Sequence, residues 1–550
     1  MAGFARATPA GRCDGHARVQ LPALGFAALF RVSGRTARYR PRSIPPTRRR
    51  ESAMFDSIPS PCAPVRRTPL AACLAAILCL TASATAAAAT TWTVDTCDDA
   101  DTGSGTTGSL RHAAANAASG DTIDMSALAC STISLTTGGG GTIVLPQADI
   151  TLIGPGKDAL TIENGSDRVF RHDGLGGTLA VKNLTVANGY LHPSAGISAD
   201  GGCIRSNGKV YLSHAAVRSC RASAVGAAAR GGGIYALSDI FAKYSDITGN
   251  VATHTGGGLG GGGGIYTAGL AGPIGPNDPN SQVILASSTL SGNSASTGMG
   301  GGLRAFHSVS VIASTISGNT AVFGGGVYMQ DNLSSASDTF TLLNSTVSGN
   351  LGTLRVGGVQ TNAGTIHVYN ATVAFNTAGS ATGSGSRHYA PGLTISDSGA
   401  DGTTTFKAVT LQSSIFSNNT YSNPMATADD IGVAKFTSGS VNSTPTNGSN
   451  NLAFATTIIG LPNTLTRGVC PQLQPLRDNG GPTQTHALFA GSPAIDAGNT
   501  LAAGIGIFDQ RGQARVSGAA ADIGAYEVQQ GDFVFSDGFE LELPPTCPGG

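Results

Sequence analysis

Charge is scarce in this chain of 550 residues, because Asp, Glu, Lys and Arg together make up 12% of it, against roughly 25% in an average protein. Aromatic residues account for 6%, with a single tryptophan. No CxxC, HxH or HExxH pattern occurs, so the sequence gives no support for zinc or metal-assisted hydrolysis. No GxSxG motif suggests a serine nucleophile. Since 40% of the residues are apolar, this low charge indicates a folded chain and not a disordered one.

Positive charge is concentrated at the N-terminus and conceals an acidic remainder. Thirteen of the 33 cations and three of the 33 acids precede residue 90, which leaves 20 cations, 30 acids and a net charge of −10. No basic stripe follows. Nucleic acid is therefore not expected as a partner.

The N-terminal region has the pattern of a secretory signal peptide. Met54 is followed by Arg66 and Arg67, an apolar run over 70–80 and the small residues "TASATAAAA", which are the three parts of such a signal. We place the signal at 54–89, and interpret 1–53 as an upstream or disordered extension. The apolar run is too short to span a bilayer. "LAAC" (70–73) precedes that run instead of ending it, so lipidation is not expected.

Six cysteines lie beyond residue 89, and an even number in an exported chain predicts disulfides. They are Cys97, Cys130, Cys203, Cys220, Cys470 and Cys547. Sequence alone allows 15 pairings of six cysteines. Proximity along the chain favours Cys97–Cys130 and Cys203–Cys220, which leaves Cys470–Cys547.

Glycine is abundant, with 78 residues, and it recurs in runs such as "GGGIY", "GGGLR" and "GGGVY". Successive runs are 24 to 38 residues apart. Glycine allows the tight backbone turns that a Cβ would obstruct, so these runs are predicted to be corners of a repeated coil. The glycines chosen as corner residues are Gly233, Gly264, Gly302 and Gly326.

A second signature, typified by "TISGN", alternates with the glycine runs. Its asparagines are Asn250, Asn293, Asn319, Asn350 and Asn376. Short Val, Ile and Thr segments bounded by Gly and Asn predict strands and turns. Coils of about this length suit a parallel β-helix, in which Ile316 and Val327 point inward and stacked asparagines bond to one another. The sequence therefore predicts an all-β fold, with a parallel β-helix over 142–425 and insertions at 267–282 and 378–392.

Three resemblances extend this prediction. Residues 142–425 resemble right-handed, single-stranded, pectin lyase-like β-helices, and the paired signatures resemble polymorphic outer membrane protein repeats, with "VAFNT" (373–377) nearest their second motif. Residues 91–125 resemble the N-terminal segment of CSLREA-type surface proteins, which implies a cap over 90–141. "LRDNGGPTQTHALFAGSPAIDAGN", "DQRGQAR" and "DIGAYE" resemble the choice-of-anchor Q domain. This resemblance implies an anchor-type β extension over 426–530 and a tail over 531–550.

Candidate catalytic residues are few. Asp239, Lys243 and Asp246 form one small charged group in the sequence, and Asp331 and Asp338 flank a later turn. We interpret both groups as solvated turn residues, so that no catalytic, cofactor-binding or metal-binding residue is assigned. The alternative is that insertions bring acids together, as a polysaccharide lyase or glycoside hydrolase requires.

Two further clusters that contain acidic residues occur in the sequence. Asp98, Asp99 and Asp101 offer oxygens to Ca²⁺, but the full loop pattern of a calcium site is missing, and no cofactor is predicted. In the anchor-type motifs, the charged residues are expected to lock turns by buried polar pairing instead of catalysing a reaction. These residues are Asp496, Asp509, Arg511 and Asp522.

Together these observations predict an exported bacterial protein, on the outer membrane surface or released from it, that acts in adhesion or recognition. Its expected partners are cell-surface glycans or envelope components, and it is expected to be a monomer. About 120 residues follow the repeats, too few for both the anchor-type domain and an outer-membrane barrel, so the export machinery is expected to act in trans. The alternatives are a polysaccharide lyase or hydrolase and a purely structural surface component.

Overall fold

The computed structural model describes residues 88–258, 260–268, 282–330, 338–379, 389–396, 408–422, 429–434, 446–455, 465–501, 506–532 and 547. The chain divides into two compact units, Met1–Ser83 and Ala84–Gly550, and every described residue belongs to the second. The predicted extension over 1–53, all but the last two residues of the predicted signal peptide, Asp331, most of both insertions and the tail beyond 532 other than Cys547 lie outside the described residues.

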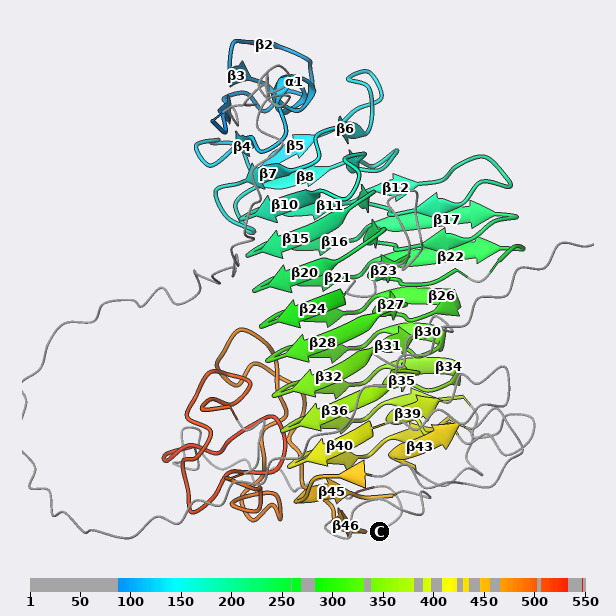
Figure 1. Ribbon diagram of the computed structural model, residues 1–550, viewed down its shortest axis with the longest axis vertical. Coiled ribbons are helices and arrows are strands. Elements are labelled where there is room, and N and C mark those ends of the chain that lie inside the picture. The colour runs from blue at the N-terminus through cyan, green and yellow to red at the C-terminus, as the bar shows by residue number, and fades with distance from the viewer. Residues whose placement is uncertain are drawn as a thin grey trace, which may run out of the picture. The chain divides into compact units, whose positions relative to one another are not determined.

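The second unit is an all-β parallel solenoid, as predicted (Figure 1). From β10 (Thr178–Lys182) onward, each described full coil runs through a strand of sheet A, a strand of sheet B, a strand of sheet D and a strand of sheet C before it returns to sheet A, whereas the two coils before β10 have no sheet D strand. Each strand pairs in parallel with its counterparts in the neighbouring coils; Val210, for example, lies opposite Ile240. Parallel pairing begins at Thr91 and continues to Arg467, beyond both ends of the predicted 142–425.

Sheet A consists mainly of strands of four or five residues. In sheet order they are β2 (Gly103–Ser104), β3 (Thr107–Gly108), β1 (Thr91–Val94), β4 (Thr122–Asp124), β7 (Ile150–Ile153), β10 (Thr178–Lys182), β15 (Lys209–Ser213), β20 (Ile240–Lys243), β24 (Gln282–Ala286), β28 (Ser308–Ile312), β32 (Thr339–Leu343), β36 (Thr365–Tyr369), β40 (Ala408–Gln412) and β44 (Thr446–Asn447).

Sheet B has strands of three residues. They are β46 (Leu465–Arg467), β45 (Asn451–Ala453), β41 (Ile415–Ser417), β37 (Thr372–Ala374), β33 (Thr346–Ser348), β29 (Thr315–Ser317), β25 (Thr289–Ser291), β21 (Asp246–Thr248), β16 (Ala216–Arg218), β11 (Thr185–Ala187), β8 (Thr161–Glu163) and β5 (Thr132–Ser134).

Sheet C follows the glycine runs. Its strands are β43 (Ile431–Ala434), β39 (Leu393–Ser396), β35 (Val359–Thr361), β31 (Val327–Met329), β27 (Leu303–Ala305), β23 (Ile265–Thr267), β19 (Ile234–Ala236), β14 (Ile204–Ser206), β9 (Phe170–His172) and β6 (Ile143–Leu145).

Sheet D precedes the glycine runs. Its strands are β12 (Tyr190–Leu191), β17 (Arg221–Val225), β22 (Val251–Thr255), β26 (Ser294–Met299), β30 (Thr320–Phe323), β34 (Leu351–Arg355), β38 (Thr377–Ala378) and β42 (Thr420–Tyr421), with the separate pair β13 (Ala199–Asp200) and β18 (Ala229–Arg230). Small side chains line its inner side, including Ala222, Ala252 and Ala199, which form a cluster of their own. A Cβ on Gly260 would lie 2.3 Å from the Ala229 carbonyl oxygen, so this layer is too thin for larger residues.

The interior of the solenoid is a column of aliphatic side chains. One residue in two points inward along each strand, and Ile234, Ile247, Ile316 and Val327 are fully buried in this column. Burial of such side chains contributes roughly 1.5–3 kcal/mol each. Coil-on-coil burial is therefore what stabilises the stack, since no coil encloses a core by itself.

An asparagine ladder forms the corner between sheets B and D. Nδ2 of each asparagine donates to Oδ1 of the asparagine in the next coil at 2.9 Å, and also to a strand carbonyl of the preceding coil. Oδ1 in turn accepts two N–H groups of the preceding coil. Each side-chain amide in the middle of the ladder thus uses all of its hydrogen-bonding capacity. The rungs are Asn250, Asn293, Asn319, Asn350, Asn376 and Asn419.

The glycine runs are needed because they pack on this ladder. A Cβ on Gly233 would lie 3.0 Å from Cγ of Asn250 and 2.8 Å from the carbonyl oxygen of Gly264 in the next coil. The same two contacts recur at Gly264, Gly302 and Gly326. In the last coil Asp430 replaces the glycine, and its Oδ1 accepts 2.7 Å from Asn419 Nδ2. The two signatures alternate in the sequence because they are in contact in the fold.

A serine ladder, which the sequence analysis missed, forms the corner between sheets A and B. Oγ of Ser288 accepts the backbone N–H of Ser245 at 3.1 Å and donates to the Ala286 carbonyl at 2.9 Å. Ser314 and Ser345 repeat this arrangement. The residue before each serine has a left-handed backbone. These residues are Tyr244, Ser287, Ala313 and Asn344, with φ between 46° and 49°, and His214 before Ala215 has the same conformation at this corner.

The tyrosines after the glycine runs lie on the outer side of sheet C, where they are largely buried. Tyr235 stacks on Tyr266 at 5.6 Å between ring centroids. The guanidinium of Arg304 lies over the rings of both Tyr266 and Tyr328. Burial raises the pKa of Tyr235 to about 12.

A short helix and three disulfides complete the unit. Helix α1 (Leu110–Asn116) starts at Ser109, which accepts the His112 N–H, and it buries Leu110 against the first coils. The disulfides are Cys97–Cys130, Cys203–Cys220 and Cys470–Cys547, the pairs that proximity favours. They indicate an oxidising compartment. No helix among the described residues is long and apolar enough to cross a bilayer.

The chain after sheet B returns over the outside of that sheet. We call residues 470–501 and 506–532 the covering segment; it consists of turns and isolated bridges and lies beside the C-terminal coils (orange to red in Figure 1). Its apolar residues, including Leu488 and Ile523, pack on Ala374, Ile415 and Leu452 of sheet B. Polar bonds accompany this contact, for instance between Thr315 Oγ1 and the Gln484 carbonyl.

Candidate binding face and charged groove

The charged group proposed from sequence is not brought together as a unit. Asp239 pairs with Lys209 at 3.0 Å, and Asp246 pairs with Lys157 at 2.6 Å. The Lys243 ammonium lies 5.4 Å from the centroid of the Tyr244 ring. The three residues therefore have separate partners at three places on one coil. Asp338 is fully buried, 3.8 Å from the imidazole of His307.

Asp98 and Asp99 at the N-terminal cap also have hydrogen-bond partners within the chain. Oδ1 of Asp99 accepts two bonds from Arg111, at 2.7 and 2.9 Å. Oδ2 of Asp99 accepts from the backbone N–H of Thr136 at 2.6 Å. Asp98 accepts from the Thr96 hydroxyl. Within the described ranges, no cluster of three or more His, Cys, Asp or Glu side chains is arranged to hold a metal ion.

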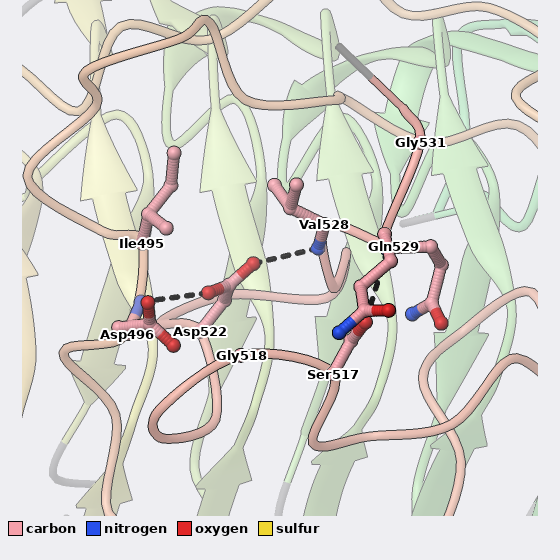
Figure 2. A pocket seen from close by; sticks show the side chains of 9 residues that line it. Ile495, Asp496, Ser517, Gly518, Asp522, Val528, Gln529 and Gly531 are labelled. Carbon is pink, nitrogen blue, oxygen red and sulfur yellow. Dashed lines mark hydrogen bonds between the residues drawn. The ribbon is translucent and has the colours of Figure 1, made fainter. Parts of the chain in front are cut away.

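Two anchor-motif acids line a hollow of about 390 Å³ in the covering segment (Figure 2). Oδ1 of Asp522 accepts the backbone N–H of Asp496 at 2.8 Å, and Oδ2 accepts that of Val528 at 2.7 Å. Asp496 itself accepts the N–H of Ala520. Burial raises the pKa of Asp522. These carboxylates hold turns together, because their oxygens already accept backbone donors.

Asp509 and Arg511 form a buried ion pair at 2.8 Å elsewhere in the covering segment. The Arg511 guanidinium also lies 3.7 Å from the centroid of the Tyr526 ring. Glu527 accepts the backbone N–H groups of Ser517 and Asp522, and burial raises the pKa of Glu527 to about 7. The motif charges thus bond to one another and to the backbone of their own segment.

A charged groove of about 430 Å³ lies over sheet B, at an edge of the covering segment. Asp158, Asp246 and Asp478 line it from three separate parts of the chain, together with Arg218. Lys157 forms the ion pair with Asp246. Hydroxyl groups of two sheet B strands complete the lining. They belong to Thr248, Thr289 and Ser291.

The outer side of sheet A holds the most prominent aromatic surface. Tyr211 and Phe241 lie opposite each other on β15 and β20, with ring centroids 5.2 Å apart and an angle of 6° between the planes. At the adjacent corner, His214 stacks on Tyr244 at 4.9 Å. All four side chains are at least partly exposed. We call these four residues the aromatic face.

Two lysines border the aromatic face. Lys182 lies 6.0 Å from the centroid of the Tyr211 ring, and Lys243 lies beside Tyr244. Register places Lys182, Ser213 and Lys243 in one column along the stack. Towards the C-terminus the neighbouring outward column, which contains Tyr211 and Phe241, becomes polar. Its members there are Ser310, Thr341, His367 and Thr410.

The aromatic face is not among the features predicted from the sequence, although the spacing of its residues carries a signal. Tyr211 and Phe241 are 30 residues apart, which matches one coil. Once the runs "GGCIR" (201–205) and "GGGIY" (231–235) are aligned, these two positions fall in register on the sheet A strand that comes after each sheet C strand. The charged groove has no comparable signal, because Asp158 lies in a turn before the first aligned glycine run and Asp478 lies in the covering segment.

Comparison with known proteins does not assign the chain to a family. No family model matches the chain, and no curated protein matches it. Among solved structures, pectate lyase Pel9A is similar with a TM-score of 0.41 and 12% sequence identity, over 80% of this chain and 97% of that one. At this level of similarity the match carries no functional argument, and the site must be interpreted from its own residues.

Proposed function

We propose that this is an exported bacterial protein, displayed at the outer membrane surface or released from it, that recognises glycans through the aromatic face. The three disulfides support a position outside the cytoplasm. The resemblance of the repeats to polymorphic outer membrane protein repeats, and of residues 426–530 to a choice-of-anchor domain, supports a place at the cell envelope.

The observation that carries this proposal is the pair of ring stacks on the uncovered sheet. Tyr211 with Phe241, and His214 with Tyr244, form two partly exposed ring stacks in consecutive coils. The C–H groups of a sugar ring can pack on the exposed part of such rings, while neighbouring ammonium groups donate to its oxygens. Coils repeat about every 4.8 Å, so a chain of sugar units lying along the stack meets several coils at once.

A glycan array tests this proposal. The purified protein is compared with the Tyr211→Ala/Phe241→Ala double variant, and with Ser310→Ala/Thr341→Ala as a matched pair on the same outward column. Retention of one or more glycans that falls at least tenfold in the aromatic variant alone is expected. Equal retention by all three proteins, or none by the unmodified protein, contradicts the proposal.

Cleavage of a polysaccharide is a second candidate function, and the charged groove favours it. Asp158, Asp246 and Asp478 line one groove with Arg218, and glycoside hydrolysis uses a pair of carboxylates on either side of the scissile bond. Release of reducing ends or unsaturated products from polyuronates would support this function, provided that Asp246→Asn and Asp158→Asn each abolish the release. Product formation that survives both substitutions would place the activity elsewhere.

A further inference from the structure

The lysines on the outer side of sheet A differ in what neutralises them. Lys209 pairs with Asp239 at 3.0 Å. Lys182 and Lys243 form no ion pair with a residue that the structure describes; instead, the ammonium group of each lies within 6.0 Å of the centroid of a ring of the aromatic face. Lys243 is exposed and Lys182 is half-buried. We call Lys182 and Lys243 the unpaired lysines; their charge is open to a ligand that lies on the aromatic face.

The strands around the aromatic face carry no negative charge to offset these lysines. From β7 to β40, the described strands of sheet A contain neither Asp nor Glu. Two acids lie just outside the strands. Asp239 has Lys209 as its partner, and Oδ1 of Asp149 accepts the N–H of Thr178 at 2.9 Å. Since the chain beyond residue 89 has a net charge of −10, the aromatic face is a positive area on an acidic protein, and it favours an anionic ligand.

The unpaired lysines are two coils apart. Register places Lys182 opposite Ser213, and Ser213 opposite Lys243. Strands of neighbouring coils are about 4.8 Å apart, so the Cα atoms of the two lysines are about 10 Å apart along the stack, with an uncharged hydroxyl between them. One unit of an extended sugar chain advances by a distance close to that of one coil. The two lysines therefore match negative groups on every second sugar.

We propose that the aromatic face binds an acidic polysaccharide that carries a negative group, a carboxylate or a sulfate, on every second sugar. Lys182 and Lys243 bind two such groups, and the rings of Tyr211 and Phe241 pack against the sugar between them. This inference rests on the proposed glycan recognition and specifies its ligand, because ring stacks by themselves do not distinguish a neutral glycan from an acidic one.

The test is calorimetric titration of the full-length protein with matched polymers. Hyaluronan carries a carboxylate on every second sugar, carboxyl-reduced hyaluronan has the same backbone without charge, and carboxyl-reduced chondroitin sulfate carries sulfates alone. A thymidine oligonucleotide is included, because aromatic rings with nearby cations also bind single-stranded nucleic acid. Binding of hyaluronan, of the sulfated chain or of both, about tenfold tighter than that of the neutral chain, supports the inference.

Lysine variants assign this binding to the two side chains. Lys182→Ala/Lys243→Ala should weaken it about tenfold, as should a rise in NaCl from about 50 mM to about 500 mM. Lys182→Arg/Lys243→Arg should retain it. Lys209→Ala is the matched control, since Lys209 lies on the same sheet but already has an acidic partner, and it should leave binding unchanged. Equal binding of charged and neutral chains, an equal loss in Lys209→Ala, or tighter binding of the oligonucleotide overturns the inference.

A third lysine tests the spacing. Ser213→Lys places a cation on the coil between the unpaired lysines. Polygalacturonate, which carries a carboxylate on every sugar, should then bind about fivefold more tightly than it binds the unmodified protein, and hyaluronan should gain less. A gain that is no larger for polygalacturonate than for hyaluronan contradicts the alternating pattern.

Failure of this inference is distinguishable from failure of glycan recognition as a whole. If neutral glycans are retained on the array and lost in Tyr211→Ala/Phe241→Ala, while Lys182→Ala/Lys243→Ala binds as well as the unmodified protein, glycan recognition stands and the acidic ligand does not. If no glycan binds, neutral or acidic, both proposals fail.

Discussion

The outer sides of sheets A and B differ sharply, although the same coils build both. Facing inward, both sheets supply aliphatic residues to one column. Facing outward, sheet B carries Ala374, Ile415 and Leu452 where the covering segment packs on it, whereas sheet A carries aromatic and hydroxyl groups that remain at least partly exposed. In a solenoid the inward residues fix the fold, so the outward residues of each sheet are free to specialise.

The contact on sheet B is also more polar than its apolar cluster suggests. Nε2 of Gln510 donates to the hydroxyls of Thr315 and Thr483, and Oε1 accepts from Thr346. His486 donates from Nδ1 to the Gln474 carbonyl. Repeated hydroxyls of the strands therefore bind the covering segment, and the same type of hydroxyl lines the charged groove just beyond its edge.

Burying a charge under the covering segment should have the largest effect. Ile415 is fully buried beneath that segment, so Ile415→Asp should lower the free energy of unfolding by about 4 kcal/mol or release the segment. Thr410→Asp, on sheet A of the same coil, should cost less than about 1 kcal/mol. Thermal unfolding and limited proteolysis measure both. Equal losses would contradict the difference between the two faces.

A fall in pH should have the next largest effect, because it should destabilise the contact between the covering segment and sheet B. Burial lowers the pKa of His486 to about 4, against about 6.5 in the unfolded chain. Nε2 accepts from Ser348 at 2.8 Å, so protonation would break this bond and charge a buried site. Between those two values the unfolded state binds more protons, so about 3 kcal/mol of stability, present above pH 6.5, is lost as the pH falls towards 4.

Unfolding measured at pH 7 and at pH 4.5 checks this dependence. His486→Gln should reduce the difference between the two pH values, while His367→Gln on the open sheet should leave it unchanged. A loss of stability in acid that survives His486→Gln would assign it to other buried imidazoles, such as His172, whose pKa burial also lowers. Asp430 cannot be its source, because burial raises the pKa of that carboxyl to about 7 and its protonated form stabilises the fold at low pH.

The same division between inward and outward residues explains which features of the fold and of the candidate site can be predicted from the sequence. Ile316, Val327 and Asn319 were assigned to the interior and the corner correctly, because identical neighbours above and below make their environment repeat in the sequence. The aromatic face was not predicted, since no motif marks outward residues. The packing of Ile415 under Ile523 was also out of reach, because it joins residues about a hundred positions apart.

Loss of a single hydroxyl under the covering segment should lower the free energy of unfolding more than loss of a hydroxyl on the outer side of sheet A. Ser348→Ala removes the donor to His486 Nε2 and leaves a buried acceptor unpaired, which should cost about 1–2 kcal/mol. Ser310→Ala on sheet A should change stability by less than about 0.5 kcal/mol. Chemical denaturation gives both values. A loss of similar size at Ser310 would mean that the open face is as constrained as the covered one.

The smallest expected effect is the coupling within the aromatic face. Tyr211 and Phe241 stack with nearly parallel rings, and such pairs are worth about 0.5–1.5 kcal/mol beyond their burial. A double-mutant cycle of Tyr211→Ala and Phe241→Ala should give a coupling near the lower limit, because both rings are partly exposed; the Ser310 and Thr341 pair should give none. If the ring coupling is also zero, the stack does not hold the rings in place. Glycan binding would then have to order them, and the tenfold loss expected on the array would include the entropy of that ordering.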